Sequence, residues 1–355
     1  MVRALARVDA GAIERNCARL AALAPLCAVV KADGYGHGAV EAARAARAGG
    51  ARWLAVATAD EADQLRAAGI AGPLLILGAL SRDELERAIA AGADVIAWRT
   101  GFAERVAGRT GVHVKLDTGM GRLGTRDGDE ADAVVAAAGD ALRGLMTHFA
   151  TSDDDPGFMR EQLGTFLAWS ARHPGILRHA ANSAAALGDL ETRLDLVRCG
   201  IAIYGMDPFH RDPADHGLEP ALSLHSYVAQ LKPCAKGESA GYGRRFVAER
   251  DTWVATVPVG YADGIRRALT NNADVLIGGR RHPLVGTVSM DNITVDLGPA
   301  PSAPVAIGAP VVLIGSQGDE RILAEELARR LQTINYEVTC AISARVPREH
   351  VGGSS

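Results

Sequence analysis

The sequence predicts an α/β protein: a (β/α)₈ TIM barrel followed by a mostly antiparallel β domain. Over roughly the first 200 residues, short apolar segments alternate with helical segments, which is typical of a parallel sheet with crossover helices. Eight apolar segments occur there, which is the number of strands in a closed barrel of this kind. Beyond about residue 218, apolar or alternating segments lie between glycine and proline turns, which indicates antiparallel strands.

Each predicted strand of the barrel is a short apolar run. In chain order the runs are 27–30, 53–57, 74–77, 94–97, 112–116, 142–147, 176–181 and 194–197. The predicted helices are 39–48, 59–68, 82–91 with Ser81 as N-cap, 101–107, 129–138 and 159–172, with a short helix after Ser183. A doubly wound open sheet would show the same alternation, and the count of eight strands favours the barrel.

The second part of the chain has a different pattern. Its predicted strands are 222–231, 252–257, 273–277, 287–297 and 310–314, and its one predicted helix is 322–331. The dipeptides Asp212-Pro213 and Glu219-Pro220 mark the boundary. The expected domains are therefore residues 1–217 for the barrel and residues 218–355 for the β domain.

Composition excludes several classes of partner. The chain has 355 residues, 48% of them hydrophobic and 23% charged, with a net charge of −4, which is typical of a globular protein with no affinity for nucleic acid or anionic membranes. Its five scattered cysteines form no C-x-x-C or zinc-type spacing, so we expect no metal site and a reducing compartment. Arg3, Arg7 and Asp9 interrupt any signal-peptide core, and no apolar stretch is long enough to span a bilayer. The expected location is the cytoplasm.

Lys31 ends the first apolar run and precedes Gly34, Gly36 and Gly38. Partial burial of a lysine at a strand end can lower its pKa and free the amine as a nucleophile. Such an amine forms Schiff bases with carbonyl compounds, pyridoxal phosphate (PLP) among them. The alternative is a lysine whose ammonium simply reaches solvent from the strand end.

Polar residues also follow the other predicted strands. Because active-site groups of a barrel sit at the carboxyl ends of its strands, we expect these residues to converge on one mouth. They are Lys31, Lys115, Asp117, Thr147, His148, Asn182, Ser183 and Arg198. Barrels often bind phosphate after strands seven and eight, where this chain has Asn182-Ser183 and Cys199-Gly200-Ile201. PLP requires a lysine amine for its aldehyde and a binding site for its phosphate, and this combination would supply both.

A competing pattern is Gly119-Met-Gly-Arg-Leu-Gly124, which matches the G-x-G-x-x-G dinucleotide fingerprint. It follows Lys115-Leu-Asp117, which places charges at the end of the strand. No clean strand ending in Asp or Glu follows about 20 residues later, as that fingerprint requires. We therefore expect no dinucleotide site here.

Several motifs occur in a fixed order along the chain. They are Val29-Val-Lys31-Ala-Asp-Gly-Tyr35-Gly-His-Gly38, Lys115-Leu-Asp-Thr-Gly-Met-Gly-Arg122-Leu-Gly, Met146-Thr-His148-Phe-Ala, Ala181-Asn-Ser183, Val197-Arg198-Cys-Gly200-Ile201-Ala-Ile-Tyr204-Gly, Ser239-Ala-Gly-Tyr242-Gly, Pro258-Val-Gly-Tyr261-Ala-Asp-Gly, Ser289-Met290-Asp291-Asn and Thr333-Ile-Asn-Tyr-Glu-Val. In this order, and over nearly the whole chain, they resemble the alanine racemases.

The resemblance implies a PLP barrel plus a β domain, working as a head-to-tail homodimer with shared active sites. Lys31 would bind PLP covalently, and Arg198 would face the pyridine nitrogen with His148 beside the ring. The residues implied around the phosphate are Tyr35, Ser183, Gly200, Ile201 and Tyr204. The residues implied for the substrate side are Arg122, Tyr261, Met290 and Asp291, the last two from the partner subunit, with partner Tyr242 as the second base.

These roles agree with the chemistry of racemisation, which removes a proton from one face of Cα and returns it on the other. Lys31 and Tyr242 can serve the two faces as acid and base. Arg198 does not readily give up its proton, so it should leave the pyridine nitrogen unprotonated and limit transamination. The implied reaction is interconversion of L- and D-alanine, which supplies D-alanine for peptidoglycan in a bacterial cytoplasm.

Lys115 lies where Arg122 and Arg198 are expected to converge, and a third cation there would be repelled. In some members of the family this lysine is carbamylated, which turns a cation into an anion that can bind Arg122. We expect the same modification of Lys115.

One departure from the family pattern bears on specificity. The family often has tyrosine before the C-terminal Arg-Val-Pro-Arg segment, where this chain has Ala344. Loss of that side chain should open the substrate entrance, so a broader racemase or a serine racemase is the first alternative. A decarboxylase of the same architecture is a second, against which Arg198 and Tyr242 argue. A catalytically silent PLP-binding protein is a third, but such proteins generally lack the second domain.

Overall fold

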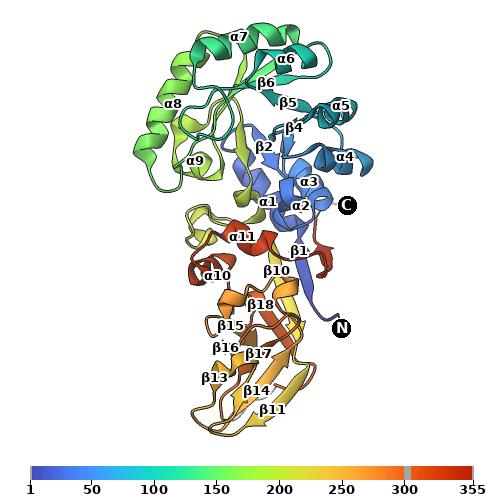
Figure 1. Ribbon diagram of the computed structural model, residues 1–355, viewed down its shortest axis with the longest axis vertical. Helices are drawn as coiled ribbons and strands as arrows, with labels where there is room; N and C mark the ends of the chain where they lie inside the picture. Colours follow the sequence, from blue (N-terminus) through green and yellow to red (C-terminus); the bar gives the residue numbers. More distant parts are fainter. Residues whose placement is uncertain (1, 300–304, 354–355) are drawn as a thin grey trace. The chain divides into compact units, whose positions relative to one another are not determined.

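Figure 1 shows the computed structural model of the chain, which describes residues 2–299 and 305–353. The backbone separates into two compact units. Residues 11–219 form the first, called the barrel unit below. Residues up to Ala10, together with 220–352, form the second, called the β unit.

The barrel unit is built on eight parallel strands. They are β2 (Leu26–Val29), β3 (Trp53–Val56), β4 (Leu74–Ile76), β5 (Asp94–Ala97), β6 (Val112–Lys115), β7 (Leu142–Met146), β8 (Leu177–His179) and β9 (Val197–Cys199). Their order is β8-β7-β6-β5-β4-β3-β2-β9. The Asp195 N–H donates to Arg178 O (3.0 Å) and the Arg198 N–H to Ala181 O (2.9 Å), so the two ends of this order meet. The predicted fold class, a (β/α)₈ barrel followed by a β domain, is confirmed.

Helices surround these strands. They are α1 (Ala10–Ala21), α2 (Lys31–Tyr35), α3 (Ala39–Ala48), α4 (Ala59–Ala67), α5 (Arg82–Ala90), α6 (Thr100–Val106), α7 (Gly128–Ala138), α8 (Pro156–Ser170) and α9 (Ser183–Gly188). Short 3-10 helices are η1 (Gly139–Ala141), η2 (Leu190–Thr192), η3 (Ile201–Tyr204) and η4 (Pro213–His216). Thr58 with Glu61, and Ser81 with Glu84, form capping boxes that start α4 and α5, so the predicted Ser81 N-cap is confirmed.

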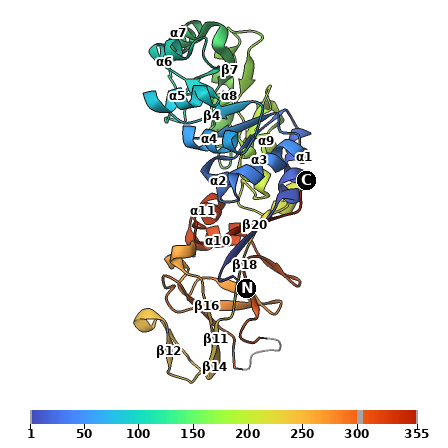
Figure 2. The same ribbon diagram turned by 90° about the vertical axis from the view of Figure 1, so that its right-hand side faces the viewer.

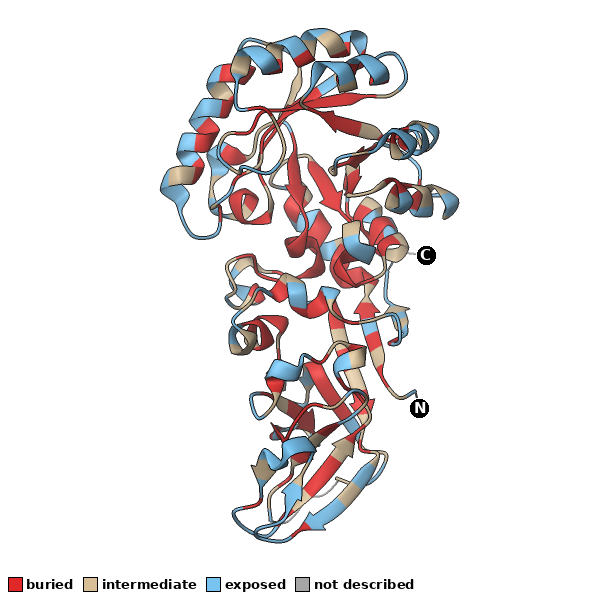
Figure 3. Cartoon of the chain, viewed as in Figure 1, coloured by how far each residue is buried: buried red, intermediate tan, exposed pale blue. Residues whose placement is uncertain are grey.

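The core of the barrel unit lies on the strands, which Figure 3 colours as buried, while the helices around them carry exposed residues. All four residues of β2 and all four of β6 are buried. Two of the β6 residues, His113 and Lys115, are polar. Buried polar side chains need hydrogen-bond partners, so His113 and Lys115 indicate polar interactions inside the barrel.

The β unit is a ten-stranded sheet with two helices. Its strands are β1 (Leu5–Asp9), β10 (Leu222–Tyr227), β11 (Gln230–Cys234), β14 (Thr252–Val257), β15 (Asp274–Ile277), β16 (Arg280–Val285), β17 (Ile293–Asp296), β18 (Pro310–Gln317), β19 (Glu320–Ile322) and β20 (Arg348–Val351). The order is β11-β14-β17-β16-β15-β18-β10-β1-β20, with β19 on β18; only the β1–β20 pair is parallel. The helices are α10 (Ala324–Leu331) and α11 (Asn335–Cys340), with 3-10 turns η5 (Tyr242–Arg244), η6 (Tyr261–Asp263) and η7 (Arg267–Leu269).

A separate hairpin, β12 (Ser239–Ala240) and β13 (Phe246–Val247), carries η5 between its strands. Its Phe246 packs against Cys234 and Val254, which lie on β11 and β14. Figure 2 shows β12 beside these two strands. The hairpin thus presents Tyr242 at a turn held by a small apolar cluster.

Some elements differ from the sequence prediction. Residues 5–9, expected in the barrel domain, form a β-unit strand that pairs with β10 and β20. The predicted strand 222–231 is two strands, because the chain turns between β10 and β11. The last barrel strand lies three residues later than predicted, and α1 and α11 were not predicted. Short elements like these are fixed by their partners in the fold, which periodicity does not reveal.

Candidate active site

Lys31 is separated from β2 by Val30 alone and begins an unusual backbone segment. Ala32, Asp33 and Tyr35 all have φ between 51° and 55°, so the chain makes a left-handed turn. This conformation costs a non-glycine residue roughly 1–2 kcal/mol, and it persists only where surrounding contacts hold it. The turn therefore fixes the backbone that carries Lys31.

Contacts from neighbouring elements hold this turn in place. The Ala32 N–H donates to the Glu61 Oε1 of α4 (2.7 Å), and the Asp33 Oδ1 accepts from the Ala39 N–H at the start of α3 (3.0 Å). The His37 ring stacks on Tyr204, with 4.4 Å between ring centroids. Glu61 was not singled out from the sequence, because a helix N3 glutamate ordinarily serves only its own cap.

The predicted phosphate residues gather beside Lys31. Tyr35 and Tyr204 lie 5.1 Å apart between ring centroids. The Ser183 Oγ accepts from the N–H groups of Gly200 (3.1 Å) and Ala202 (3.3 Å). A Cβ at Gly200 would overlap the Tyr35 Oη, so only glycine lets that hydroxyl approach. Ile201, at the start of η3, is fully buried.

Arg198 lies on β9 and is buried. Its Nη1 donates to His179 Nδ1 (2.7 Å), and its Nη2 contacts Thr147 O (2.8 Å), Ala180 O (2.9 Å) and His148 Nδ1 (3.1 Å). No described residue accepts from its Nε–H. Burial lowers the pKa of Arg198 to about 10, so the guanidinium stays charged at neutral pH. His179 was missed in the sequence, although a histidine at the end of a predicted strand is a usable signal.

Lys115 and His148 lie within the field of Arg198. Burial and the charges of Arg198 and Arg122 lower the pKa of Lys115 to about 8. Burial, then the charges of Arg198, Lys115, Arg122 and Lys31, holds the pKa of His148 well below its usual value. His148 is therefore neutral, and because its Nδ1 accepts from Arg198, its proton is on Nε2.

The segment 119–124 is a loop rather than the start of a helix, since α7 begins only at Gly128. Its shape comes from Asp117, whose carboxylate accepts from the N–H groups of Gly119 (3.1 Å) and Gly121 (3.0 Å) and pairs with Arg126 (3.1 Å). These bonds hold the pKa of Asp117 below its usual value despite partial burial. The glycines of the G-x-G-x-x-G segment thus belong to a loop, folded around Asp117, that carries Arg122.

A buried glutamine supports the neighbouring loop. Gln162 of α8 accepts from the Ala150 N–H (2.9 Å) and contacts His148 O (3.4 Å) and Thr118 Oγ1 (3.3 Å). Thr118 Oγ1 also lies 2.7 Å from Thr147 Oγ1. A helix glutamine carries no sequence signal for such a role, so its position could be found only in the fold.

The remaining predicted residues, Tyr242, Tyr261, Met290 and Asp291, belong to the β unit. The structure brings their segments together within that unit. Thr287 Oγ1 donates to Tyr242 O (2.7 Å), and the N–H groups of Tyr261 and Ala262 donate to Ser289 O (3.0 Å) and Met290 O (3.1 Å). Tyr242, Tyr261 and Met290 are exposed, at 73%, 43% and 52%, which is unusual for large apolar side chains and leaves them available to a partner.

The segment containing Ala344 joins this cluster. The Ser343 Oγ donates to Ala262 O (2.7 Å), and the Arg345 Nη2 donates to Asp291 Oδ1 (2.7 Å). Ala344 stands between them and is exposed. The position where the chain departs from the family pattern therefore lies between two residues that bond Ala262 and Asp291.

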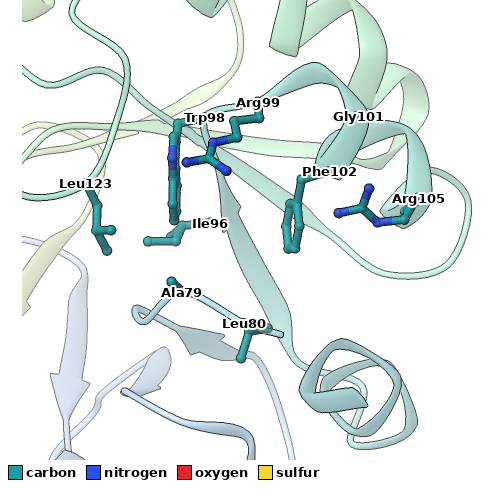
Figure 4. Close-up of a pocket in the computed structure, with 9 residues that line it drawn as sticks. All are labelled: Ala79, Leu80, Ile96, Trp98, Arg99, Gly101, Phe102, Arg105 and Leu123. Carbon is teal, nitrogen blue, oxygen red and sulfur yellow. The ribbon is translucent and has the colours of Figure 1, made fainter. Parts of the chain in front are cut away.

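A further cavity of about 530 Å³ opens beside the ends of β4 and β5 (Figure 4). It is lined by Ala79, Leu80, Ile96, Trp98, Arg99, Gly101, Phe102, Arg105 and Leu123. None of the predicted site residues lines it. Among the described residues no group of His, Cys, Asp and Glu has the arrangement of a metal site.

Comparisons with known proteins bear on this geometry. Residues 8–208 match the family "Alanine racemase, N-terminal domain", and residues 221–350 match "Alanine racemase, C-terminal domain". The chain belongs to the alanine racemase family. Members of this family are PLP-dependent isomerases.

Individual alanine racemases are similar over almost the whole chain. The alanine racemase 1 of Bacillus subtilis is 41% identical over 363 residues, covering 97% of this chain and 92% of that protein. The alanine racemase of Frankia casuarinae is 41% identical over 376 residues, covering 99% of this chain and 97% of that protein. The crystal structure of alanine racemase from E. faecalis is 36% identical with a TM-score of 0.92, and it covers 98% of both chains.

The residues of this chain fit the family's cofactor. Lys115, Arg122 and Arg198 form no ion pair with any described carboxylate, so the site has an excess of positive charge. Lys115 and Arg198 are buried, whereas Arg122 is exposed. Buried cations require anionic partners, and PLP brings a phosphate and a phenolate oxygen. The hydroxyls of Tyr35, which lies against Gly200, and of Ser183, together with the Nε–H of Arg198, are donors of the kind that this ligand requires.

Proposed function

We propose that the protein interconverts L- and D-alanine, with PLP bound through Lys31. The observation that carries this proposal is the positive charge of Arg122 and of the buried Arg198, close to Lys31, with which no described carboxylate forms an ion pair. A ligand with several negative charges satisfies it, and PLP with an amino-acid carboxylate provides them. The reaction itself, racemisation of alanine, is inferred from membership of the alanine racemase family.

The residues that would hold PLP are those around Lys31. Lys31 would bind it covalently, Arg198 would face the ring nitrogen, and His148 would lie beside the ring. Tyr35, Ser183, Gly200, Ile201 and Tyr204 would surround the phosphate. When bound, PLP supplies an electron-accepting ring that makes the Cα proton of the amino acid acidic.

The chain's own residues would move the protons. The Lys31 amine serves one face of Cα, and the Oη of Tyr242, from the partner subunit, serves the other. His148, neutral and with its proton on Nε2, can donate a hydrogen bond that stabilises a tyrosinate. Arg122 would bind the substrate carboxylate, with Tyr261, Met290 and Asp291 around the entrance.

We also propose that the active protein is a homodimer. The exposed cluster of Tyr242, Tyr261 and Met290 supports this, because a patch of large exposed side chains marks an interaction surface. None of the described helices is both long and apolar enough to cross a membrane. We place the enzyme in the cytoplasm, where D-alanine would serve peptidoglycan synthesis.

The test is proton NMR of L-alanine and, separately, L-serine in heavy water with the PLP-loaded protein, followed by chiral analysis. We expect deuterium at Cα and D-alanine formed much faster than D-serine. Comparable serine turnover would instead favour a broader racemase. This second candidate is supported by the exposed Ala344, whose two neighbours bond Ala262 and Asp291. No exchange with either amino acid would reject the proposal.

Arg198→Glu should raise transamination relative to racemisation by at least about tenfold, a barrier change of roughly 1.4 kcal/mol. Glutamate can share a proton with the ring nitrogen, whereas arginine keeps its own, and a protonated ring stabilises more charge. The ratio of pyridoxamine phosphate formed to D-alanine formed measures this. Arg52→Glu, the same charge change at an exposed site, is the control. An unchanged product ratio in Arg198→Glu would contradict the assignment.

We propose that Lys115 is carbamylated. With a pKa of about 8 against the usual 10.5, roughly a tenth of its amine is neutral at pH 7. The neutral nitrogen attacks CO₂, an N–C bond forms, and one proton leaves, so a cation becomes an anion beside Arg122 and Arg198. Occupancy should rise as pH increases from 6 to 8, because the neutral fraction rises.

Carbon-13 NMR with labelled bicarbonate tests this modification. We expect a carbamate resonance that grows with pH and is missing from Lys115→Arg, which keeps the charge but cannot be carbamylated. The absence of the signal at pH 8, or its persistence in the variant, would reject the modification.

A further inference from the structure

Three buried side chains and one partly buried carboxylate form a chain of hydrogen bonds inside the barrel. Arg198 Nη1 lies 2.7 Å from His179 Nδ1, His179 Nε2 lies 2.8 Å from His113 Nδ1, and His113 Nε2 lies 3.3 Å from Asp94 Oδ2. We call these four residues the relay. They come from β9, β8, β6 and β5, and Asp94 is the first residue of its strand. The relay therefore links Arg198 to the amino end of β5.

The direction of every bond in the relay follows from its two ends. A guanidinium only donates and a carboxylate only accepts. Arg198 thus requires an unprotonated Nδ1 on His179. Burial and the charge of Arg198 hold the pKa of His179 well below its usual value. His179 is therefore neutral, with its proton on Nε2. The His179 Nε2–H donates to His113 Nδ1, which must therefore be unprotonated. The proton of His113 is then on Nε2, facing Asp94. Both histidines have the same tautomer.

The backbone leaves room for this arrangement at two glycines. A Cβ at Gly144 would overlap His113 Nδ1, and a Cβ at Gly111 would overlap the carboxylate of Asp94. His113 also meets Trp53 edge-on, at 5.4 Å between ring centroids. His113 and His179 are fully buried, so neither ring has solvent as an alternative partner.

Asp94 is the carboxylate to which Arg198 is connected through the two histidines. Arg198 forms no ion pair with any described carboxylate, although it is buried and charged. Without Asp94, His113 could carry its proton on either nitrogen. A proton on His113 Nδ1 would face the His179 Nε2–H, and reversal of His179 would then oppose the Arg198 donor.

We propose that Asp94 is a positioning residue: through His113 and His179 it fixes the direction of the relay and thereby holds Arg198 in place toward the PLP ring. The proposal rests on the proposed function for its catalytic consequence. The tautomers of His113 and His179, however, can be measured in the protein without PLP.

The first experiment is nitrogen-15 NMR of the protein without PLP, labelled at its histidines, with His113 and His179 assigned from His113→Gln and His179→Gln. We expect both residues to carry the proton on Nε2 alone. A proton on Nδ1 of either one in the unsubstituted protein would overturn the proposal, and this outcome needs no folded variant of Asp94.

The second experiment compares Asp94→Ala, Asp94→Asn and the control Thr110→Val. Thr110 lies at the same end of the barrel, donates to Ala93 O (2.8 Å) and forms no hydrogen bond with a relay residue among the described interactions. In Asp94→Ala we expect mixed tautomers at both histidines, a shifted absorption maximum of the PLP-loaded protein, and kcat lowered about fivefold with KM changed less than about twofold. Asp94→Asn, which retains an acceptor oxygen, should recover at least about half of the lost kcat.

Unchanged tautomers in Asp94→Ala, or mixed tautomers with the absorption and kcat of Thr110→Val, would overturn the proposal. Failure of the unsubstituted enzyme to racemise alanine would reject the proposed function instead. The tautomers of His113 and His179 are measured without PLP, so that result does not depend on racemase activity.

Discussion

Lys31→Ala will lower the rate of alanine racemisation by about three orders of magnitude or more. The substitution removes both the covalent anchor for PLP and the base on one face of Cα. The left-handed turn after Lys31 is held by Glu61 and Asp33 through backbone N–H groups, so the fold should survive the change. Chiral chromatography of product from L-alanine measures the rate, and circular dichroism checks the fold.

Borohydride reduction of the PLP-loaded protein gives a second readout. Mass spectrometry should find the reduced cofactor on the peptide that contains Lys31, and no such adduct in Lys31→Ala. Lys236→Ala, at an exposed site, is the matched control and should retain both adduct and activity. Retained activity in Lys31→Ala, or an adduct on another lysine of the unsubstituted protein, would refute the role of Lys31.

Tyr242→Phe will lower racemisation by roughly 10²- to 10⁴-fold, the range typical of losing a positioned acid or base. Lys31 would still exchange the proton on its own face. One enantiomer of alanine should therefore take up deuterium with retention of configuration, while inversion is lost. The measurement is proton NMR in heavy water, started separately from L- and D-alanine.

Tyr227→Phe is the control, because Tyr227 lies on β10 and outside the exposed cluster. Equal loss of exchange from both enantiomers in Tyr242→Phe, with no excess of exchange over inversion, would refute the two-base assignment. Mixing Tyr242→Phe with Lys31→Ala tests the dimer independently. If subunits exchange and share sites, some mixed dimers regain an intact site, and activity reappears.

The sequence predicted most of the barrel because its strands are short apolar runs between strong helix formers. Asp94–Ala97 and Ala39–Ala48 occur with the predicted bounds. Strand ends also located Lys31, Lys115, His148 and Arg198, since all parallel strands of a barrel end on one side. Positions such as Glu61 and Gln162 were missed, because a polar residue on a helix is common and its partner lies far away in the chain.

By itself the sequence determined the alternation that makes a barrel, the motifs that mark the family, and the departure at Ala344. These are local or ordered patterns, which can be read without knowing what packs against what. Only the tertiary structure decided that residues 5–9 join the β unit, that Lys115 and His148 have lowered pKa values, and that Asp94 reaches Arg198 through two histidines. Strand pairing, desolvation and hydrogen-bond direction depend on which groups meet in space, and residues 94, 113, 179 and 198 meet only when the barrel closes.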